Sequence, residues 1–208
     1  MIKILINAPK GGVGKTTLAT NIALYLAKNN HRVWALDLAQ GQQMTTALKV
    51  TEHFNEEQTA NKIETRELES IPQRFNGVRN YDFLVADTDD YLEIIKDLAD
   101  RGISRGWKVI VPIMDEYNGL QRIPQEIGAL FVSSMFTGEL DFNLKIVPNK
   151  IIDIDSIEKI RIQLENHGIE EFISESYITN CEAEAPYYIN EENFNEGIRV
   201  LLEEIEVI

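Results

Sequence analysis

The feature that most constrains this chain is a glycine-rich segment near the amino terminus, between an apolar run and a helix-like run. The apolar run covers residues 2–6, the glycine-rich segment APKGGVGKTT covers residues 8–17, and residues 18–27 repeat apolar side chains at helical spacing. Strand, glycine-rich turn and helix form the context in which a loop can bind phosphate. Glycines let successive backbone N–H groups curve round an anion, and the helix start adds partial positive charge. The segment therefore predicts nucleotide binding; the alternative is a glycine-rich turn with incidental lysines.

Four residues define the type of loop. Lys15 is placed to reach the β- and γ-phosphates, and the Thr16 hydroxyl to bind Mg²⁺. The common pattern G-x-x-x-x-G-K-[ST] requires glycine at position 9, where this chain has Pro9, and a second lysine, Lys10, precedes the glycine pair. The segment is therefore a variant loop with the sequence K-G-G-x-G-K-T-T.

Strand-like runs alternate with helix-like segments along the chain, which predicts an α/β fold with a doubly wound, mostly parallel sheet of about six to eight strands and helices on both faces, the P-loop NTPase fold. The chain of 208 residues suits a single domain covering residues 1–208. The predicted strands are residues 2–6, 32–37, 62–65, 81–87, 107–112 and 142–147. The predicted helices include residues 16–29, 66–75, 119–133, 153–166 and 191–206.

Acidic residues end two of the predicted strands, where open α/β sheets place their ligand sites. Asp87 ends an apolar strand, the Walker B arrangement, in which the carboxylate reaches Mg²⁺ through water beside the loop threonine. Asp37 ends the second strand, and the alternative for it is a carboxylate that caps the next segment. Asp89 and Asp90 follow Asp87 and belong either to the outer shell of Mg²⁺ or to a helix N-cap, which the helical run after them favours.

The charge of the chain narrows the choice of partners. The net charge is −14, and residues 170–208 alone hold eleven acidic residues against one arginine. This balance disfavours non-specific attraction to DNA or to anionic lipid. The last predicted helix has an apolar stripe and an almost wholly acidic opposite face, whereas a membrane-surface helix carries Lys and Arg there. We therefore expect a packed terminal helix and no membrane role.

Other classes of protein are disfavoured by what the composition lacks. No apolar run approaches the ~20 residues of a membrane span, and the first run is too short for a signal peptide. A single cysteine, Cys181, gives neither a disulfide framework nor a metal-ligand cluster, and the three histidines have no metal-ligand spacing. We expect a cytoplasmic protein.

The K-G-G-x-G-K-T-T segment resembles the deviant Walker A loop of the ParA/MinD family of ATPases. Weaker similarities lie at residues 81–87, at residues 107–121, where V-I-V-P…E-Y…L is similar to a family segment, and at the E-A-P of residues 184–186. The length is similar to that of small plasmid-type ParA partition proteins. Two metal-bearing relatives, the nitrogenase-reductase type and the zinc-bridged ATPases, require cysteine pairs that this chain lacks.

The resemblance implies a cycle in which ATP and Mg²⁺ bring two subunits face to face and a ParB-like or adaptor protein triggers hydrolysis. Lys10 would cross to the partner's phosphates and Lys15 would bind phosphate within the subunit, both in catalytic roles. The implied Mg²⁺ residues are Thr16, Asp37 and Asp87. The implied nucleotide-binding residues are Lys10, Gly11, Gly12, Val13, Gly14, Lys15, Thr16, Thr17 and, as an adenine contact, Asn149.

One departure from the family pattern bears on catalysis. After the second strand the family reads D-x-D-P-Q, and its second Asp orients the attacking water, whereas this chain has Ala39 there. Alanine cannot accept a proton from water, and losing such a group slows chemistry by ~10²–10⁴-fold. Gln40, Gln42 or Asp89 could substitute. The family's C-P-P after the Walker B Asp is also replaced, by T-D-D.

Three functions follow as hypotheses. The first is a slow, partner-stimulated ATPase switch in plasmid or chromosome partition or in cargo positioning. The second is a nucleotide-loaded scaffold that never turns over, which Ala39 favours and the two loop lysines oppose. The third is a small-molecule P-loop ligase or kinase, which the K-G-G form of the loop opposes.

Overall fold

The structure, a computed structural model, describes residues 1–9, 11–52, 62–68, 70–72, 80–89, 94, 97–98, 101, 106–115, 123–125, 127, 142–181 and 191–208. The strands are β1 Ile2–Ile6, β2 Val33–Asp37, β3 Ile63–Glu67, β4 Phe83–Asp87, β5 Trp107–Ile113 and β6 Phe142–Pro148. The helices are α1 Lys15–Lys28, α2 Gln43–Glu52, α6 Ile154–Glu165 and α7 Glu192–Glu204, with a 3₁₀ turn, η1, at Glu170–Phe172.

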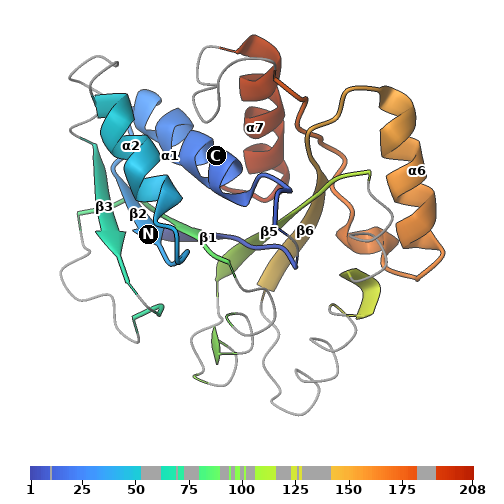
Figure 1. The fold of residues 1–208 in the computed structure, drawn as a ribbon, viewed down its shortest axis with the longest axis horizontal. Helices are drawn as coiled ribbons and strands as arrows, with labels where there is room; N and C mark the ends of the chain where they lie inside the picture. Colours follow the sequence, from blue (N-terminus) through green and yellow to red (C-terminus); the bar gives the residue numbers. More distant parts are fainter. Residues whose placement is uncertain are drawn as a thin grey trace.

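The six strands form one sheet in the order β3-β2-β4-β1-β5-β6, and every pairing between them is parallel (Figure 1). The predicted doubly wound sheet is therefore confirmed. Asp87 of β4 pairs in register with Ile6 of β1 and with Asp37 of β2. The carboxyl ends of the three central strands thus meet at one edge of the sheet, next to the start of α1.

Both faces of the sheet are covered, because neighbouring residues of β1 contribute to separate apolar clusters. Ile4 and Ile6 pack with the buried side chains of α1, α2 and α7. Leu5 belongs to the opposite cluster with Trp107 and with the buried side chains of α6. Figure 1 shows α1, α2 and α7 together over one face and α6 beside β6. A strand buried on both faces carries consecutive apolar residues, as Ile4, Leu5 and Ile6 of β1 do.

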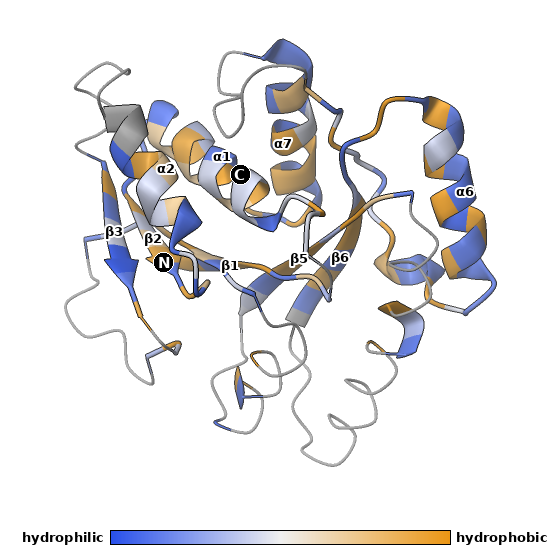
Figure 2. Ribbon diagram, in the orientation of Figure 1, coloured by the Kyte–Doolittle hydropathy of each residue, from blue (hydrophilic) through white to orange (hydrophobic). Residues whose placement is uncertain are grey.

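The edge strand β3 is longer than the sequence predicts. A strand at residues 62–65 and a helix at 66–75 were expected, but Arg66 and Glu67 continue the strand. The helix prediction is wrong at these two residues because parallel pairing with β2 extends to Asp37↔Glu67, and the Arg66 guanidinium lies 5.0 Å from the centroid of the Trp34 ring. It is also wrong at residues 68 and 70–72, which are described and are not helical. Figure 2 shows β3 as largely hydrophilic, as expected of an edge strand.

Two other predictions fall mainly on residues that the structure does not describe. Of the helix predicted at 119–133, residues 123–125 and 127 are described; they are helical, and Ile123 and Ile127 are buried. The E-A-P segment at 184–186 lies outside the described residues. The end of the helix predicted at 66–75, residues 73–75, also lies outside the described residues.

Helix α7 closes the fold and packs as predicted. Its apolar stripe is buried, at Phe194, Ile198, Leu201 and Leu202, and Ile205 just after the helix is buried as well. At Gly197 a Cβ atom would lie 2.7 Å from the Tyr177 carbonyl oxygen, so the helix approaches the 174–179 segment through a glycine. Among the described residues, no helix is long and apolar enough to cross a membrane.

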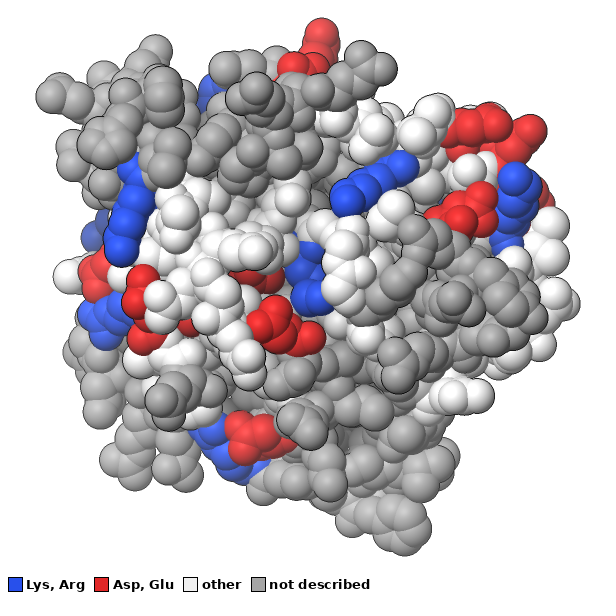
Figure 3. Space-filling view, in the orientation of Figure 1, with Lys and Arg blue, Asp and Glu red and all other residues white. Residues whose placement is uncertain are grey.

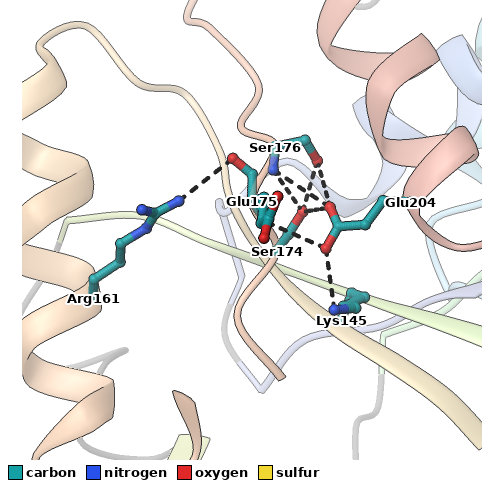
Figure 4. Close-up of polar contacts among 6 residues, drawn as sticks. All are labelled: Lys145, Arg161, Ser174, Glu175, Ser176 and Glu204. Atoms are coloured by element: carbon teal, nitrogen blue, oxygen red, sulfur yellow. Dashed lines mark hydrogen bonds and ion pairs between the residues drawn. The ribbon is translucent and has the colours of Figure 1, made fainter. Parts of the chain in front are cut away.

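One acidic residue of α7, Glu204, points inward to a polar network (Figure 4). Its carboxylate accepts hydrogen bonds from the Ser174 and Ser176 hydroxyls and from the Glu175 N–H, and it lies 3.1 Å from the Lys145 Nζ of β6. Burial alone would raise the pKa of Glu204, but these donors outweigh it and lower the pKa below its ordinary value. The network fastens α7 to β6 and to the 174–176 segment.

Candidate functional site

The glycine-rich loop follows β1 and adopts backbone angles that require glycine. Gly12 has φ 81° and Gly14 has φ 89°, both in the left-handed region that other residues avoid. Gly14 is the N-cap of α1, and its carbonyl accepts the first intrahelical bond from the Leu18 N–H at 2.9 Å. The N–H groups of the first helical turn, from Lys15 onward, therefore lie at the loop, as phosphate binding requires. Lys10 lies outside the described residues.

The loop is hydrogen-bonded to Asn149 and Lys150, the two residues that follow β6. The Asn149 side-chain Nδ2 donates to the Val13 carbonyl oxygen at 2.7 Å, and Lys150 Nζ donates to the Gly12 carbonyl oxygen at 2.8 Å. Asn149 is buried, and its backbone N–H donates to the Ile113 carbonyl at 2.7 Å. Asn149 therefore lies beside the loop, while its contact with adenine stays a prediction. Lys150 was not singled out by the sequence.

Asp87 lies at the centre of the site and is completely buried, with 0% exposure. Among the described residues, neither of its carboxylate oxygens has a hydrogen-bond partner of normal geometry. Burial raises the pKa of Asp87 to about 7; the Asp37 and Asp89 carboxylates also raise it, whereas the Thr16 hydroxyl and the Lys15 ammonium lie near enough to lower it. Thr16, Lys15 and Asp37 therefore lie in the immediate surroundings of Asp87.

Asp37 is buried beside Asp87 but is hydrogen-bonded. Its Oδ1 accepts from the Ala39 N–H at 3.2 Å, and its Oδ2 accepts from the Thr45 N–H at 2.8 Å, in the first turn of α2. The capping role weighed as the alternative is therefore present in the structure. A carboxylate has further lone pairs, so this role leaves it able to accept from a water on Mg²⁺.

The segment 38–42, between β2 and α2, is tied to the end of β4. The Leu38 N–H donates to the Asp87 carbonyl at 2.9 Å, and the Gln40 N–H donates to Asp89 Oδ2 at 2.7 Å. Ala39 is 7% exposed and presents only a methyl group. Asp89, for which the sequence favoured a helix cap, therefore fixes the segment that carries Ala39.

A pocket of about 510 Å³ opens beside this segment, bordered by β2, the 38–42 segment and the end of β3. Its lining residues are Asp37, Leu38, Ala39, Gln40, Gln42, Glu67 and Leu68. Gln40 and Gln42, two of the residues considered as substitutes for the missing carboxylate, are exposed at its rim. The pocket adjoins the acidic centre of the site through Asp37.

Asn7 is a further buried polar residue at this edge of the sheet that was not predicted from the sequence. Asn7 follows β1 directly, and its side-chain amide donates to the Thr88 hydroxyl, which in turn donates to the Ile6 carbonyl at 3.3 Å. Both side chains are buried, and they join the ends of β1 and β4. A polar residue directly after a buried parallel strand is the signal that could have found it.

The donor set fits Mg²⁺ held together with a nucleotide. Mg²⁺ is usually bound by one or two carboxylates together with substrate phosphates and water. Asp87 offers two buried oxygens without a hydrogen-bond partner of normal geometry, and the Thr16 hydroxyl is close by. No three His, Cys, Asp or Glu side chains among the described residues are grouped as metal ligands, so a Mg²⁺ ion here would depend on phosphate oxygens for the rest of its shell.

Residues 4–176 match the CobQ/CobB/MinD/ParA nucleotide binding domain family. The chain belongs to this family. The ParA/MinD resemblance of the loop is thereby confirmed at the level of the family. No curated protein matches the chain.

Solved structures of the family share the fold. A protein assigned to plasmid partition in Borrelia burgdorferi B31, solved with AMPPNP, is 15% identical with a TM-score of 0.71, covering 99% of this chain and 98% of that one. MinD in the MinC:MinD complex of Aquifex aeolicus is 20% identical with a TM-score of 0.65, covering 98% and 96%. Cobyrinic acid a,c-diamide synthase of Mycobacterium smegmatis, with ADP and magnesium, is 16% identical with a TM-score of 0.65, covering 99% and 95%. At these identities the likeness establishes the P-loop NTPase fold.

Proposed function

We propose that this protein binds Mg²⁺-ATP at the 8–17 loop and uses it as a dimerisation switch. The observation that carries the proposal is Asp87, a completely buried acid at the carboxyl edge of the sheet, whose two oxygens have no hydrogen-bond partner of normal geometry and which lies near Thr16 and Lys15. A buried polar group without partners is costly, and such groups persist where a ligand completes them. A cation bound with a nucleotide would complete this one.

In the proposed complex, Thr16 and Asp87 hold Mg²⁺ and Asp37 supports it from the outer shell. The ion neutralises charge that develops on the β- and γ-phosphates. Lys15 binds these phosphates within the subunit, and Lys10 reaches the phosphates of the second subunit. The first-turn N–H groups of α1 supply the remaining donors.

Hydrolysis in this proposal is slow. Ala39 offers no acceptor for the attacking water, so another group has to orient it. Asp89 is a candidate because the Gln40 N–H holds it beside the 38–42 segment and its charge reaches Asp87. Gln40 and Gln42 are the other candidates. Ala39 also favours the second function, a scaffold that binds partners in the ATP state without turnover.

The switch would act in the cytoplasm on plasmid or chromosome partition or on cargo positioning, through a ParB-like or adaptor protein. The net charge of −14 disfavours DNA as the surface on which it works. On the face shown in Figure 3, the coloured Lys and Arg side chains are interspersed with Asp and Glu.

Light scattering with ADP, with ATP and with a slowly hydrolysed ATP analogue tests the proposal, with phosphate release measured in parallel. Lys15→Ala should abolish ATP binding, while Lys28→Ala, on the exposed last turn of α1, should leave it intact. Normal ATP affinity in Lys15→Ala would refute the loop assignment.

A second variant tests the dimer. Lys10→Ala should keep ATP binding but lose ATP-dependent dimers, and dimers that persist in this variant would exclude the crossing role. Phosphate release that stays at the background rate with every candidate partner would favour the scaffold over the ATPase.

A further inference from the structure

The two contacts beneath the phosphate loop are made to carbonyl oxygens of consecutive peptides. Lys150 Nζ donates to the Gly12 carbonyl at 2.8 Å, and Asn149 Nδ2 donates to the Val13 carbonyl at 2.7 Å. Neither contact is to an N–H group, although N–H groups are what a phosphate loop offers its anion. The two side chains therefore hold the loop by the side that does not bind phosphate.

Because of peptide geometry, these two contacts also determine where the N–H groups of the same peptides point. A trans peptide is planar, and its C=O and the following N–H point in opposite directions. Holding the Gly12 carbonyl toward Lys150 turns the Val13 N–H away from Lys150. Holding the Val13 carbonyl toward Asn149 turns the Gly14 N–H away from Asn149.

The 149–150 pair is itself rigidly held. The Asn149 N–H donates to the Ile113 carbonyl at 2.7 Å, and the Ile151 N–H donates to the Ile178 carbonyl at 3.0 Å, so the pair is anchored on both sides. Lys150 has φ 58°, in the left-handed region that residues with a side chain seldom adopt. Strained angles of this kind persist where surrounding structure fixes them, and they gather at functional sites.

Within the loop, Gly14 leaves the space that the Asn149 side chain occupies. A Cβ atom on Gly14 would lie 2.6 Å from Asn149 Nδ2 and 3.4 Å from Lys150 Cε. Gly14 thus lacks a side chain where Asn149 approaches, in addition to having φ 89°. The close approach requires glycine as much as the turn does.

We propose that Asn149 and Lys150 are positioning residues, which orient the Gly12–Val13 and Val13–Gly14 peptides so that their N–H groups face the nucleotide phosphates. This inference rests on the proposed nucleotide binding. Lys150 acts through the backbone: its ammonium is engaged by a carbonyl, and its effect falls on whichever phosphates the loop holds, in ADP as in ATP.

The test uses the full chain, with Mg²⁺-ADP and Mg²⁺-ATP titrated by calorimetry. Lys150→Met keeps the aliphatic stem and removes the donor; Lys150→Arg keeps a donor; Lys28→Met is the control for an exposed lysine remote in sequence. Lys150→Met should weaken ADP and ATP by the same factor, roughly 10-fold or more, the usual size for a hydrogen bond to a charged group. Lys150→Arg should recover most of that loss, and Lys28→Met should bind like the wild type.

A spectroscopic readout separates positioning from a general loss of structure. In ¹H–¹⁵N spectra, the Val13 amide signal should shift on ADP binding in the wild type and shift less in Lys150→Met. The Gly14 amide signal should respond in the same way in Asn149→Asp, which replaces the Nδ2 donor with an acceptor. The melting temperature of nucleotide-free Lys150→Met should stay close to that of the wild type, because Lys150 is only partly buried.

Three outcomes would overturn the inference while leaving nucleotide binding in place. They are wild-type affinity in Lys150→Met, a loss for ATP much larger than for ADP, which would mean direct contact with the γ-phosphate, and an unchanged Val13 amide response. If the wild type and Lys28→Met bind neither nucleotide, the proposed function fails and the inference fails with it.

Discussion

Two inward-facing carboxylates in this molecule, Asp87 completely buried and Glu204 partly buried, have opposite surroundings. Asp87, at the end of β4, has no hydrogen-bond partner of normal geometry among the described residues, although the Thr16 hydroxyl lies close to it, and burial raises its pKa to about 7. Glu204, on α7, is bonded to Ser174, Ser176 and Lys145, and its pKa is lowered (Figure 4). Both acids are held by well-packed elements, so packing does not account for the difference.

The comparison separates a structural acid from an acid that awaits a ligand. Around Glu204 the chain supplies every donor itself, and the result is a link between α7 and β6. Around Asp87 the chain supplies few, because the Thr16 hydroxyl and the Lys15 ammonium offset only part of the effect of burial, and further positive charge would have to come from a ligand. A buried acid without donors is therefore the better guide to a binding site.

The largest effect is expected where the loop meets Asn149. Gly14→Ala forces a Cβ atom to within 2.6 Å of Asn149 Nδ2 at a residue with φ 89°. Backbone strain and the displaced Asn149 bond should together cost about 3 kcal/mol of stability. ATP affinity should fall by ~10-fold or more. Thermal unfolding and calorimetry measure the two effects, and a variant that binds ATP normally would show that the contact with Asn149 is dispensable.

Asp87→Asn should stabilise the nucleotide-free protein while weakening the site. The raised pKa of Asp87 means that ionising it in the folded state opposes folding, and this penalty grows as pH rises from about 4 to about 7. Removing the charge should gain about 2 kcal/mol at pH 8, less than the pKa shift alone implies because the amide is buried too. Chemical denaturation of the nucleotide-free protein checks this. A destabilised Asp87→Asn would mean that Asp87 is structural, like Glu204.

Glu204→Gln should change stability in the other direction. The substitution removes the ion pair with Lys145 and leaves an amide among donors. A loss of about 1 kcal/mol is expected, because the group is partly exposed and solvent screens it. Glu192→Gln, on the exposed first turn of the same helix, is the matched control. Equal unfolding midpoints for these two variants would remove the distinction between the two acids.

The smallest expected effect is the pH dependence of the Glu204 contribution. Because the pKa of Glu204 is lower in the folded state, its stabilisation is complete above the ordinary value of 4.5 and is lost as pH falls through the folded value. The difference between wild type and Glu204→Gln should therefore be constant from pH 6 to 7 and shrink below pH ~4.5. Denaturation at several pH values measures it, and a difference that grows on acidification would contradict the assigned direction.

Local patterns were enough to predict the parts of the fold that depend on the order of residues. The apolar runs, the loop glycines and the strand-ending acids Asp37 and Asp87 place the central strands and their common edge, because parallel strands bring their carboxyl ends together. The apolar stripe of α7 predicted its packing. The strand at residues 62–65 was found, but its continuation through Arg66 was not, since that depends on pairing with β2 and on the Trp34 ring.

Contacts between residues distant in sequence could not be predicted in this way. Lys150 lies 138 positions from the Gly12 carbonyl it holds, and Asp89 lies 49 positions from the Gln40 N–H. Glu204 looks like one more acid on an acidic helix until Lys145 and Ser174 are placed next to it. In each case the chemistry is set by the partner, and the local sequence carries no sign of which partner that is.

The central claim is that the buried carboxylate of Asp87 binds the Mg²⁺ of a bound nucleotide. Calorimetric titration of ATP into the wild type and into Asp87→Asn, each with Mg²⁺ and with EDTA, tests it most directly. The account predicts that Mg²⁺ tightens ATP binding to the wild type by ~10-fold or more and has little effect on Asp87→Asn. Equal ATP affinity with and without Mg²⁺ in the wild type, or the same Mg²⁺ effect in both proteins, would contradict it.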